Sequence, residues 1–293
     1  MFITLTELRY LIALAKEKHF GQAAAKCFVS QPTLSIALKK LESNLGLQLF
    51  ERHKNAILTT AAGEEIIAQA QQVITAVAKI EDFATHRHNQ FATPLKLGAI
   101  HTVGPYLFPN LISTINQVNP NLKLLIEEDM TANLSAKLAH GELDAIIVAK
   151  PFNAPHITCI DLYSEPLDVI IPANHPWQAA TKIRPEQLND QPLLLLGSGH
   201  CFRDQVLLIC PQCITPQGGS IITTSIETIK YMVASTIGIS IVPRRALQGI
   251  NPQLILAKPF TQPTPQREII LAYRSGFSRL QPIETLIQII QQC

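Results

Sequence analysis

Phe28-Val29-Ser30-Gln31-Pro32-Thr33-Leu34-Ser35 is the stretch that decides the fold of the N-terminal part of this chain. Ser30 is a favourable residue for capping the N-terminus of a helix, and Pro32 is tolerated in a first helical turn because its missing N–H would have no partner there. Gly46 provides a stop signal. Between these signals, apolar residues recur at helical spacing and predict one buried stripe: Leu34, Leu38, Leu41 and Leu45.

The sequence on both sides of this helix predicts a helix-turn-helix with a wing. Residues 8–15 place apolar side chains at helical spacing, and the alanine-rich segment 21–27 fits a short second helix. After the third helix, segments 49–52 and 56–59 flank a polar turn and predict a β-hairpin. Two short helices, a tight turn and a polar-faced helix are typical of DNA-binding heads.

The polar face of the third helix and the wing supply the predicted DNA contacts. Side chains near the start of the helix would reach base edges, and basic side chains would meet phosphates. The alternative is a plain helical bundle whose lysines are merely solvated, and the wing favours DNA binding over it. The predicted DNA-binding residues are Ser30, Gln31, Pro32, Thr33, Ser35, Lys39, Lys40 and Arg52.

Composition and charge agree with a basic head on a larger folded body. The chain has 293 residues, of which 47% are hydrophobic and 16% charged, so it can bury a substantial core and is not disordered. Residues 1–60 hold eight Lys/Arg and four Asp/Glu, whereas the rest of the chain holds 16 and 18. This basic excess suits contact between the head and nucleic acid. Because no apolar run approaches ~18 residues and the start shows no signal-peptide pattern, we expect a cytoplasmic protein without membrane contact.

Residues 61–87 predict a long linker helix. This segment contains no proline, and its apolar residues follow the heptad spacing of a coiled-coil seam. The alternative is an amphipathic helix packed on its own domain, but a long helix between a small head and a large body favours pairing with a second copy. A dimer presents two recognition helices, so we expect a partially palindromic operator. The predicted dimer-helix positions are Ile66, Ala70, Val73, Val77 and Ile80.

From residue 95 onward, apolar strands alternate with helices, which predicts an α/β body with a parallel sheet. We expect two α/β lobes, and clefts between such lobes usually bind small ligands. The predicted domains are a winged helix-turn-helix at 1–60, a linker helix at 61–90 and an effector domain at 91–293, with lobe I at 91–163 and 268–293 and lobe II at 164–267. The predicted strands are 95–100, 122–127, 143–148, 167–171, 193–196, 221–224, 239–242, 254–258 and 268–273, before a last helix from about Ile283.

One cysteine lies in a setting that favours chemistry. The segment Gly199-His200-Cys201-Phe202-Arg203-Asp204 surrounds a thiol with polar residues, and a nearby cation or a helix N-terminus favours the reactive thiolate. A buried structural cysteine is the alternative. The motif Cys210-Pro211-Gln212-Cys213 is poor evidence for zinc, which usually takes four ligands. We therefore predict no metal and no cofactor, and we do not expect the six cysteines to form a disulfide framework.

The head resembles LysR-type transcriptional regulators. The resemblance implies a DNA-binding regulator that is not an enzyme, with an effector domain of the two-lobed periplasmic-binding-protein fold. It also implies a dimer that pairs further into a homotetramer, and RNA polymerase is an expected partner. The residues that carry the resemblance are Ala23-Ala24, 29–35, Lys40-Leu41-Glu42, Leu45-Gly46, 49–52, Leu58-Thr59 and Gly63.

Within that family, the body is similar to the members that sense hydrogen peroxide. The similarity rests on segments 98–107, 199–205 and 224–228 and on the second thiol, Cys210. It implies that peroxide oxidises Cys201, which then forms a disulfide with Cys210. The positions that match residues holding peroxide or stabilising the thiolate are Thr102, Thr131, His200, Arg203 and Asp204.

The chain departs from that pattern in two places. Gly197-Ser198 stands where similar chains tend to be acidic, and Cys213 is additional. Cys213 could compete as the resolving thiol, form a bond with Cys210, or be inert.

The spacing of the thiols adds a physical expectation. Nine residues of helix span about 13.5 Å, whereas a disulfide needs Cα atoms roughly 4.4–6.8 Å apart. If Cys201 and Cys210 flank a helix, they can bond only after that helix refolds. Two other functions stay open at this point: a LysR-type regulator that answers to a small metabolite bound between the lobes, and a thiol peroxidase, against which the DNA-binding head argues.

Overall fold

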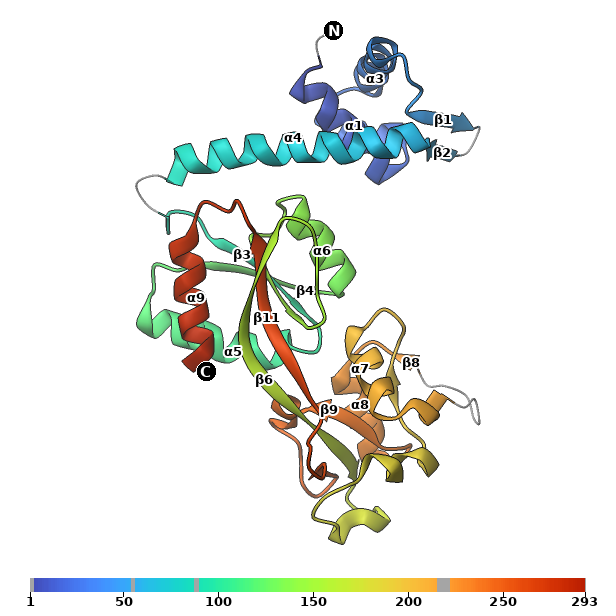
Figure 1. Ribbon diagram of the computed structural model, residues 1–293, viewed down its shortest axis with the longest axis vertical. Helices are drawn as coiled ribbons and strands as arrows, with labels where there is room; N and C mark the ends of the chain where they lie inside the picture. The colour runs from blue at the N-terminus through green and yellow to red at the C-terminus, as the bar shows by residue number, and fades with distance from the viewer. Residues whose placement is uncertain (1–2, 54–55, 87–89, 215–221, 293) are drawn as a thin grey trace. The chain divides into compact units, whose positions relative to one another are not determined.

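The computed structural model describes residues 3–53, 56–86, 90–214 and 222–292, and the chain divides into two compact units, residues 1–85 and 86–293. None of the helices in these described ranges is long and apolar enough to cross a membrane. The first unit contains α1 (Leu5–Glu17), α2 (Phe20–Lys26), α3 (Gln31–Leu45), β1 (Phe50–His53), β2 (Ala56–Thr59) and α4 (Ala61–His86) (Figure 1).

The local signals of the sequence act in the head as predicted. The Oγ of Ser30 accepts a hydrogen bond from the Thr33 N–H at 3.3 Å, which caps α3, and Gly46 ends that helix with φ +66°. The stripe side chains Leu34, Leu38 and Leu41 are fully buried. The strands β1 and β2 pair antiparallel as the predicted wing.

Helix α4 begins as part of the head. Ile67 and Ala70 are buried in the core of the first unit. Further along the same helix, Val73 is 44% and Ile80 is 70% exposed. The first turns of α4 therefore pack on their own domain, and Val73 and Ile80 are exposed from the middle of the helix onward.

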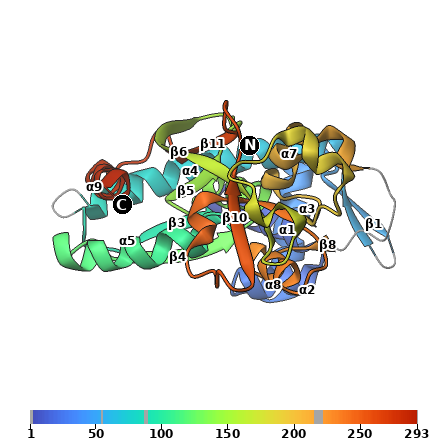
Figure 2. The ribbon, with the colours of Figure 1, turned by 90° about the horizontal axis from the view of Figure 1, so that it is seen from below.

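The second unit contains two lobes with separate hydrophobic cores. In lobe I, α5 and α9 cover one side of the sheet and α6 the other (Figure 1), and α5 packs beside α9 (Figure 2). The elements of this unit that contribute mainly to lobe I are β3 (Leu95–Ile100), α5 (Gly104–Val118), β4 (Leu124–Asp129), α6 (Thr131–Ala139), β5 (Ala145–Ala149) and α9 (Leu280–Gln292). Those of lobe II are β7 (Leu195–Leu196), α7 (Cys201–Ile209), β8 (Ile222–Thr223), α8 (Ile226–Ala234), β9 (Ser240–Pro243) and β10 (Ile255–Pro259).

One long strand, β6 (Ile157–Pro172), runs through both lobes, with Leu162 in the core of lobe I and Val169 in the core of lobe II. The long strand β11 (Gln266–Arg274) lies beside its first half and places its buried apolar residues in the core of lobe I. The two strands pair antiparallel with each other along the whole of β11. The strand order is β10-β6-β11-β5-β3-β4, with β9 also on β6. Strand β3 is parallel to β4 and β5, whereas β11 and β6 are antiparallel to their neighbours. The predicted parallel sheet is therefore wrong for these strands, because the chain leaves lobe I along β6 and returns along β11.

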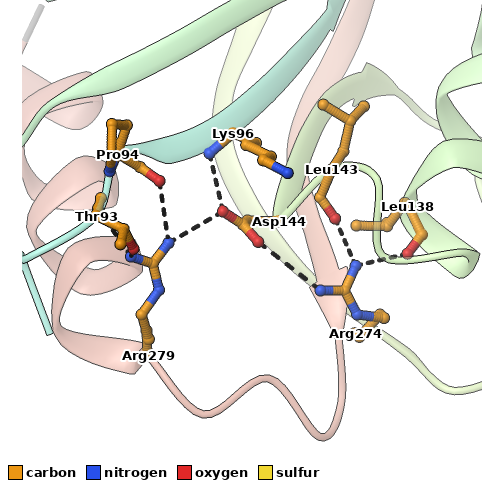
Figure 3. A network of polar contacts seen from close by, with 8 residues as sticks. All are labelled: Thr93, Pro94, Lys96, Leu138, Leu143, Asp144, Arg274 and Arg279. Atoms are coloured by element: carbon orange, nitrogen blue, oxygen red, sulfur yellow. Dashed lines mark hydrogen bonds and ion pairs between the residues drawn. The ribbon is translucent and has the colours of Figure 1, made fainter. Parts of the chain in front are cut away.

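A polar network fixes the start of the second unit to lobe I (Figure 3). The carboxylate of Asp144 lies between Arg279, at 3.0 Å, and Arg274, at 3.9 Å, and it accepts a hydrogen bond from the Lys96 N–H at 2.9 Å. Arg279 is 3% exposed and also donates to the carbonyl oxygens of Thr93 and Pro94. These contacts hold the segment that enters β3, and they keep both buried guanidinium groups close to a carboxylate.

Candidate functional site: a thiol pocket between the lobes

Cys201 is the first residue of α7 and a free, partly buried thiol. A helix N-terminus carries partial positive charge, which attracts anions. The preceding turn depends on Gly199, whose φ is +92°. A Cβ on Gly199 would also lie 3.2 Å from the sulfur of Met130. The glycine before His200 therefore both makes the turn and lets Met130 approach it.

Cys201 lines a small polar cavity formed by three segments of the chain. The space open to the centre of a water-sized molecule is about 10 Å³, close to the least that holds one such molecule. The segments are the end of β3 with the following turn, the end of β4 with the start of α6, and the turn before α7 with the start of that helix. The lining residues are Ile100, His101, Thr102, Asp129, Met130, Thr131, Gly199, His200, Cys201 and Phe202.

Two polar atoms of this cavity wall have no hydrogen-bond partner within the described part of the chain. They are the Oγ1 of Thr131 and the Nε2 of His200, and both are buried. Leaving a buried polar group unpaired costs about 1–3 kcal/mol. The pair therefore indicates a place for a small polar molecule that can both donate and accept hydrogen bonds.

A buried ion pair holds Thr102 in the cavity wall. Arg267 donates to the Thr102 hydroxyl and to its carbonyl oxygen, both at 2.8 Å, and to Glu165 at 2.7 Å. Arg267 and Glu165 are each 3% exposed. Because the Thr102 oxygen accepts from Arg267, its own O–H is left to donate elsewhere. The guanidinium also lies 5.1 Å from the ring centroid of Phe202, the neighbour of Cys201.

Charged and titratable groups surround the rim. His101 lies 3.6 Å from Glu128, and its ring is 6.0 Å from that of His200. Burial, and then His101, lower the pKa of His200 below its ordinary value. Burial acts to raise the pKa of Asp129, but hydrogen bonds from Asn133, the Met130 N–H and Lys137 outweigh it and keep that pKa low. The cavity thus has a neutral imidazole at its wall and a carboxylate at its edge.

The structure brings together part of the predicted peroxide site. Thr102, Thr131 and His200 share the cavity with Cys201. Arg203 instead donates to the carbonyl oxygen of Leu196 at 3.1 Å, and Asp204 is exposed on α7. Neither of those two residues lines the cavity.

Sequence reasoning missed the residues that support the wall from the crossing strands. Glu165 lies 102 positions from Arg267 in the chain, so no local pattern joins them. The available signal was an arginine beside the apolar run of the predicted strand 268–273. His101, Asp129 and Met130 also line the cavity without having been singled out.

Cys201 is the first residue of α7 and Cys210 follows its last residue, so the two thiols of interest lie at opposite ends of this helix. Cys201 packs against the core of lobe I, whereas Cys210 is 1% exposed in the core of lobe II, with its sulfur 3.2 Å from Oδ1 of Asn189. No bond joins Cys201 to Cys210, because Cys201 is free. The side chain of Cys213 lies outside the described residues.

The predicted DNA-binding residues lie at the exposed end and face of α3. Ser30, Gln31, Pro32, Thr33, Lys39 and Lys40 are exposed, and Ser35 is half-buried. Arg52 lies in β1, but its side chain is outside the described residues. Of the predicted dimer-helix positions, Ala70 is buried in the head, Ile66 and Val77 are half-buried, and Val73 and Ile80 are exposed.

Comparison with known proteins agrees with this architecture. Residues 5–64 match the family described as bacterial regulatory helix-turn-helix protein, lysR family, and residues 88–293 match the LysR substrate binding domain. The chain belongs to the LysR family. It is a transcriptional regulator of that family and not a member of an enzyme family.

Several LysR-family relatives are similar over nearly the whole chain. The DNA-binding transcriptional dual regulator OxyR of Escherichia coli K12 is 35% identical, over 99% of this chain and 95% of the relative. A hydrogen peroxide-inducible genes activator of Dickeya chrysanthemi is 36% identical, over 94% and 90%. A full-length OxyR variant of Pseudomonas aeruginosa has a similar structure, with a TM-score of 0.81 and 48% identity over 100% of this chain and 96% of that one. An H₂O₂-bound OxyR mutant of Corynebacterium glutamicum has a TM-score of 0.63 and 32% identity, over 100% and 92%.

Proposed function

We propose that this LysR-family regulator senses hydrogen peroxide through Cys201 and passes the signal to DNA. The main support is the cavity that is lined by the free thiol of Cys201 at the N-terminus of α7 and by Thr131 and His200, each of which has a buried polar atom without a partner among the described residues. Hydrogen peroxide is small and both donates and accepts hydrogen bonds, so it matches that wall. The relatives named as hydrogen peroxide-inducible activators support the same choice.

In the first step, the Cys201 thiolate attacks one peroxide oxygen. An S–O bond forms, the O–O bond breaks, and the second oxygen leaves as hydroxide and takes up a proton to become water. The sulfur is oxidised by two electrons to a sulfenic acid and the peroxide is reduced. The hydroxyls of Thr102 and Thr131 and the Nε2 of His200 would orient the peroxide. Arg203 and Asp204 would act from outside the cavity, on the field around α7.

In the second step, the sulfenic acid condenses with the thiol of Cys210 and releases water. Helix α7 opposes this step, because nine helical residues span about 13.5 Å and a disulfide needs roughly 4.4–6.8 Å between Cα atoms. The bond therefore requires α7 to unfold, which removes Phe202, Val206 and Cys210 from the core of lobe II. Cys210 can take this role only as a free thiol.

The refolded region would change how copies of the protein pair and how their heads meet DNA. We propose that the protein forms a dimer that pairs further into a tetramer, with an interface along α4 that uses the exposed residues Val73 and Ile80. The dimer would bind a partially palindromic operator and contact RNA polymerase in the cytoplasm. On DNA, the exposed residues at the start of α3 would read base edges, and Lys39, Lys40 and Arg52 would meet phosphates.

The decisive experiment maps disulfides by peptide mass spectrometry after stoichiometric peroxide is added to the fully reduced, full-length protein. The expected product is a Cys201–Cys210 bond together with a changed DNA footprint, and both should be lost in Cys201→Ser. A Cys201–Cys213 bond would replace Cys210 as the resolving partner. A footprint that still responds to peroxide in Cys201→Ser would refute the proposal, and saturable binding of a metabolite without thiol oxidation would favour a ligand-gated regulator.

A further inference from the structure

An apolar side chain is exposed on α3, the helix that we propose reads DNA. Ile36 lies on α3 and is 67% exposed. The buried stripe of that helix is formed by Leu34, Leu38 and Leu41. At about 100° per residue, Ile36 points roughly opposite to the centre of the stripe. Ile36 is therefore not part of the core of the head. Single exposed apolar residues are common on protein surfaces, so the role of Ile36 is decided by the residues that surround it.

The neighbours of Ile36 on the helix surface are the predicted DNA contacts. Pro32 and Thr33 lie one turn before it, and Lys39 and Lys40 one turn after it, and all four are exposed. Residues three and four positions apart share one face of a helix. Ile36 thus stands in the centre of the face that carries the base-reading and phosphate-contacting residues.

We propose that Ile36 selects thymine in the operator by contacting its 5-methyl group in the major groove. Ile36 has no hydrogen-bonding atoms in its side chain, so it cannot recognise the donor and acceptor pattern of a base edge. The thymine methyl is the apolar group that the major groove offers. The two lysines on the same face would attract the phosphates on either side and seat the helix in the groove.

DNA fits this face better than a second copy of the chain does. Two copies of the α3 face would bring Lys39 and Lys40 of each together, and like charges repel. A DNA groove meets the same lysines with phosphates of opposite charge. The inference depends on DNA binding by the head and not on peroxide sensing, so it survives if the proposed chemistry of Cys201 fails.

The test uses uracil, which is thymine without the 5-methyl group. A duplex operator is first selected from random DNA with the full-length protein, and each thymine is then replaced in turn by deoxyuridine. For the wild-type protein, one position per half-site should lose about four-fold in affinity, and about 15-fold when both half-sites are changed, as expected for one buried methyl group per half-site. Ile36→Ala should bind the thymine operator more weakly and lose this discrimination, whereas Ile36→Val should keep most of it.

Lys40→Ala is the matched control on the same helix face. It should weaken binding to thymine and uracil operators equally and reduce the dependence of binding on salt. Sedimentation of Ile36→Ala should show the same oligomer as the wild type. The inference is overturned if no single thymine matters to the wild type, if Ile36→Ala still discriminates as the wild type does, or if Ile36→Ala alters the oligomer instead of the discrimination.

Discussion

The helix between the two thiols should control the second step of the proposed switch, and Leu208 provides a way to test this. Leu208 is in the last turn of α7 and is 82% exposed, so its replacement disturbs little packing. Replacing leucine by glycine inside a helix lowers the stability of the helix by at most about 0.8 kcal/mol. If α7 must open before Cys201 reaches Cys210, the open fraction rises by up to about four-fold, and disulfide formation should accelerate by the same factor.

Sulfenic acid formation should not change in Leu208→Gly, because Leu208 does not line the cavity that contains Cys201. The two steps can be separated by rapid-quench alkylation with mass spectrometry for the disulfide, and by a sulfenic-acid trapping reagent in a Cys210→Ser background. Both measurements start from fully reduced protein. Leu208→Ala is the matched control, since alanine keeps a high helix propensity, and its disulfide rate should change by less than about two-fold. Equal disulfide rates in Leu208→Gly and the wild type would show that opening of α7 does not limit the reaction.

Four further substitutions test the cavity and the ion pair that supports its wall. Thr131→Val should slow oxidation of Cys201 without lowering the melting temperature, because the Thr131 hydroxyl oxygen is buried without a partner among the described residues. Thr102→Val should slow oxidation and also lower the unfolding free energy by about 1–3 kcal/mol, since an Arg267 donor loses its acceptor. Stopped-flow kinetics measure the oxidation rate, and chemical denaturation measures the unfolding free energy. Glu165→Gln should lower the unfolding free energy by about 3–5 kcal/mol by leaving Arg267 without its carboxylate, and a denaturation midpoint equal to that of the wild type would contradict this. The folded-state pKa of His200 is lowered, so its contribution to stability is present above its ordinary pKa of about 6.5 and is lost as the pH falls through the lower folded value. His200→Gln should therefore flatten this part of the plot of unfolding free energy against pH. An unchanged slope would argue against a neutral buried imidazole.

Strands that form one continuous apolar run could be predicted from the sequence, whereas strand segments that mix buried and exposed residues could not. The run from Leu95 to Ile100 became β3 with the predicted bounds. The second half of β6 was predicted, but its first half was missed because buried and exposed residues mix from Ile157 to Glu165. That half lies at the margin of lobe I, where one side of the strand remains open. The direction of β6 and β11 could not be predicted from the spacing of apolar residues, because it is set by how the chain crosses between the lobes.

The helix-turn-helix and the helix between the thiols were accessible because their signals are local. Ser30 and Gly46 bound α3, and α7 ends just before Pro211, as the sequence indicated. The cavity could not be predicted in this way, since Thr102 lies 99 positions and Thr131 lies 70 positions before Cys201 in the chain. Only the resemblance to a family connected them. The network of Arg267 and Glu165 was invisible for the same reason: burial of a charge pair is decided by folding at long range.

The strand that both lobes share means that the second unit should not be divided in experiments. The sixteen residues of β6 contribute to both cores: its first half pairs with β11, and its second half pairs with β9 and β10. A fragment cut to contain one lobe would divide β6 and leave the edge of a neighbouring strand unpaired, which is a template for aggregation. Truncations designed to isolate the thiol chemistry should therefore keep residues 90–292 in one piece and place the cut in the preceding linker.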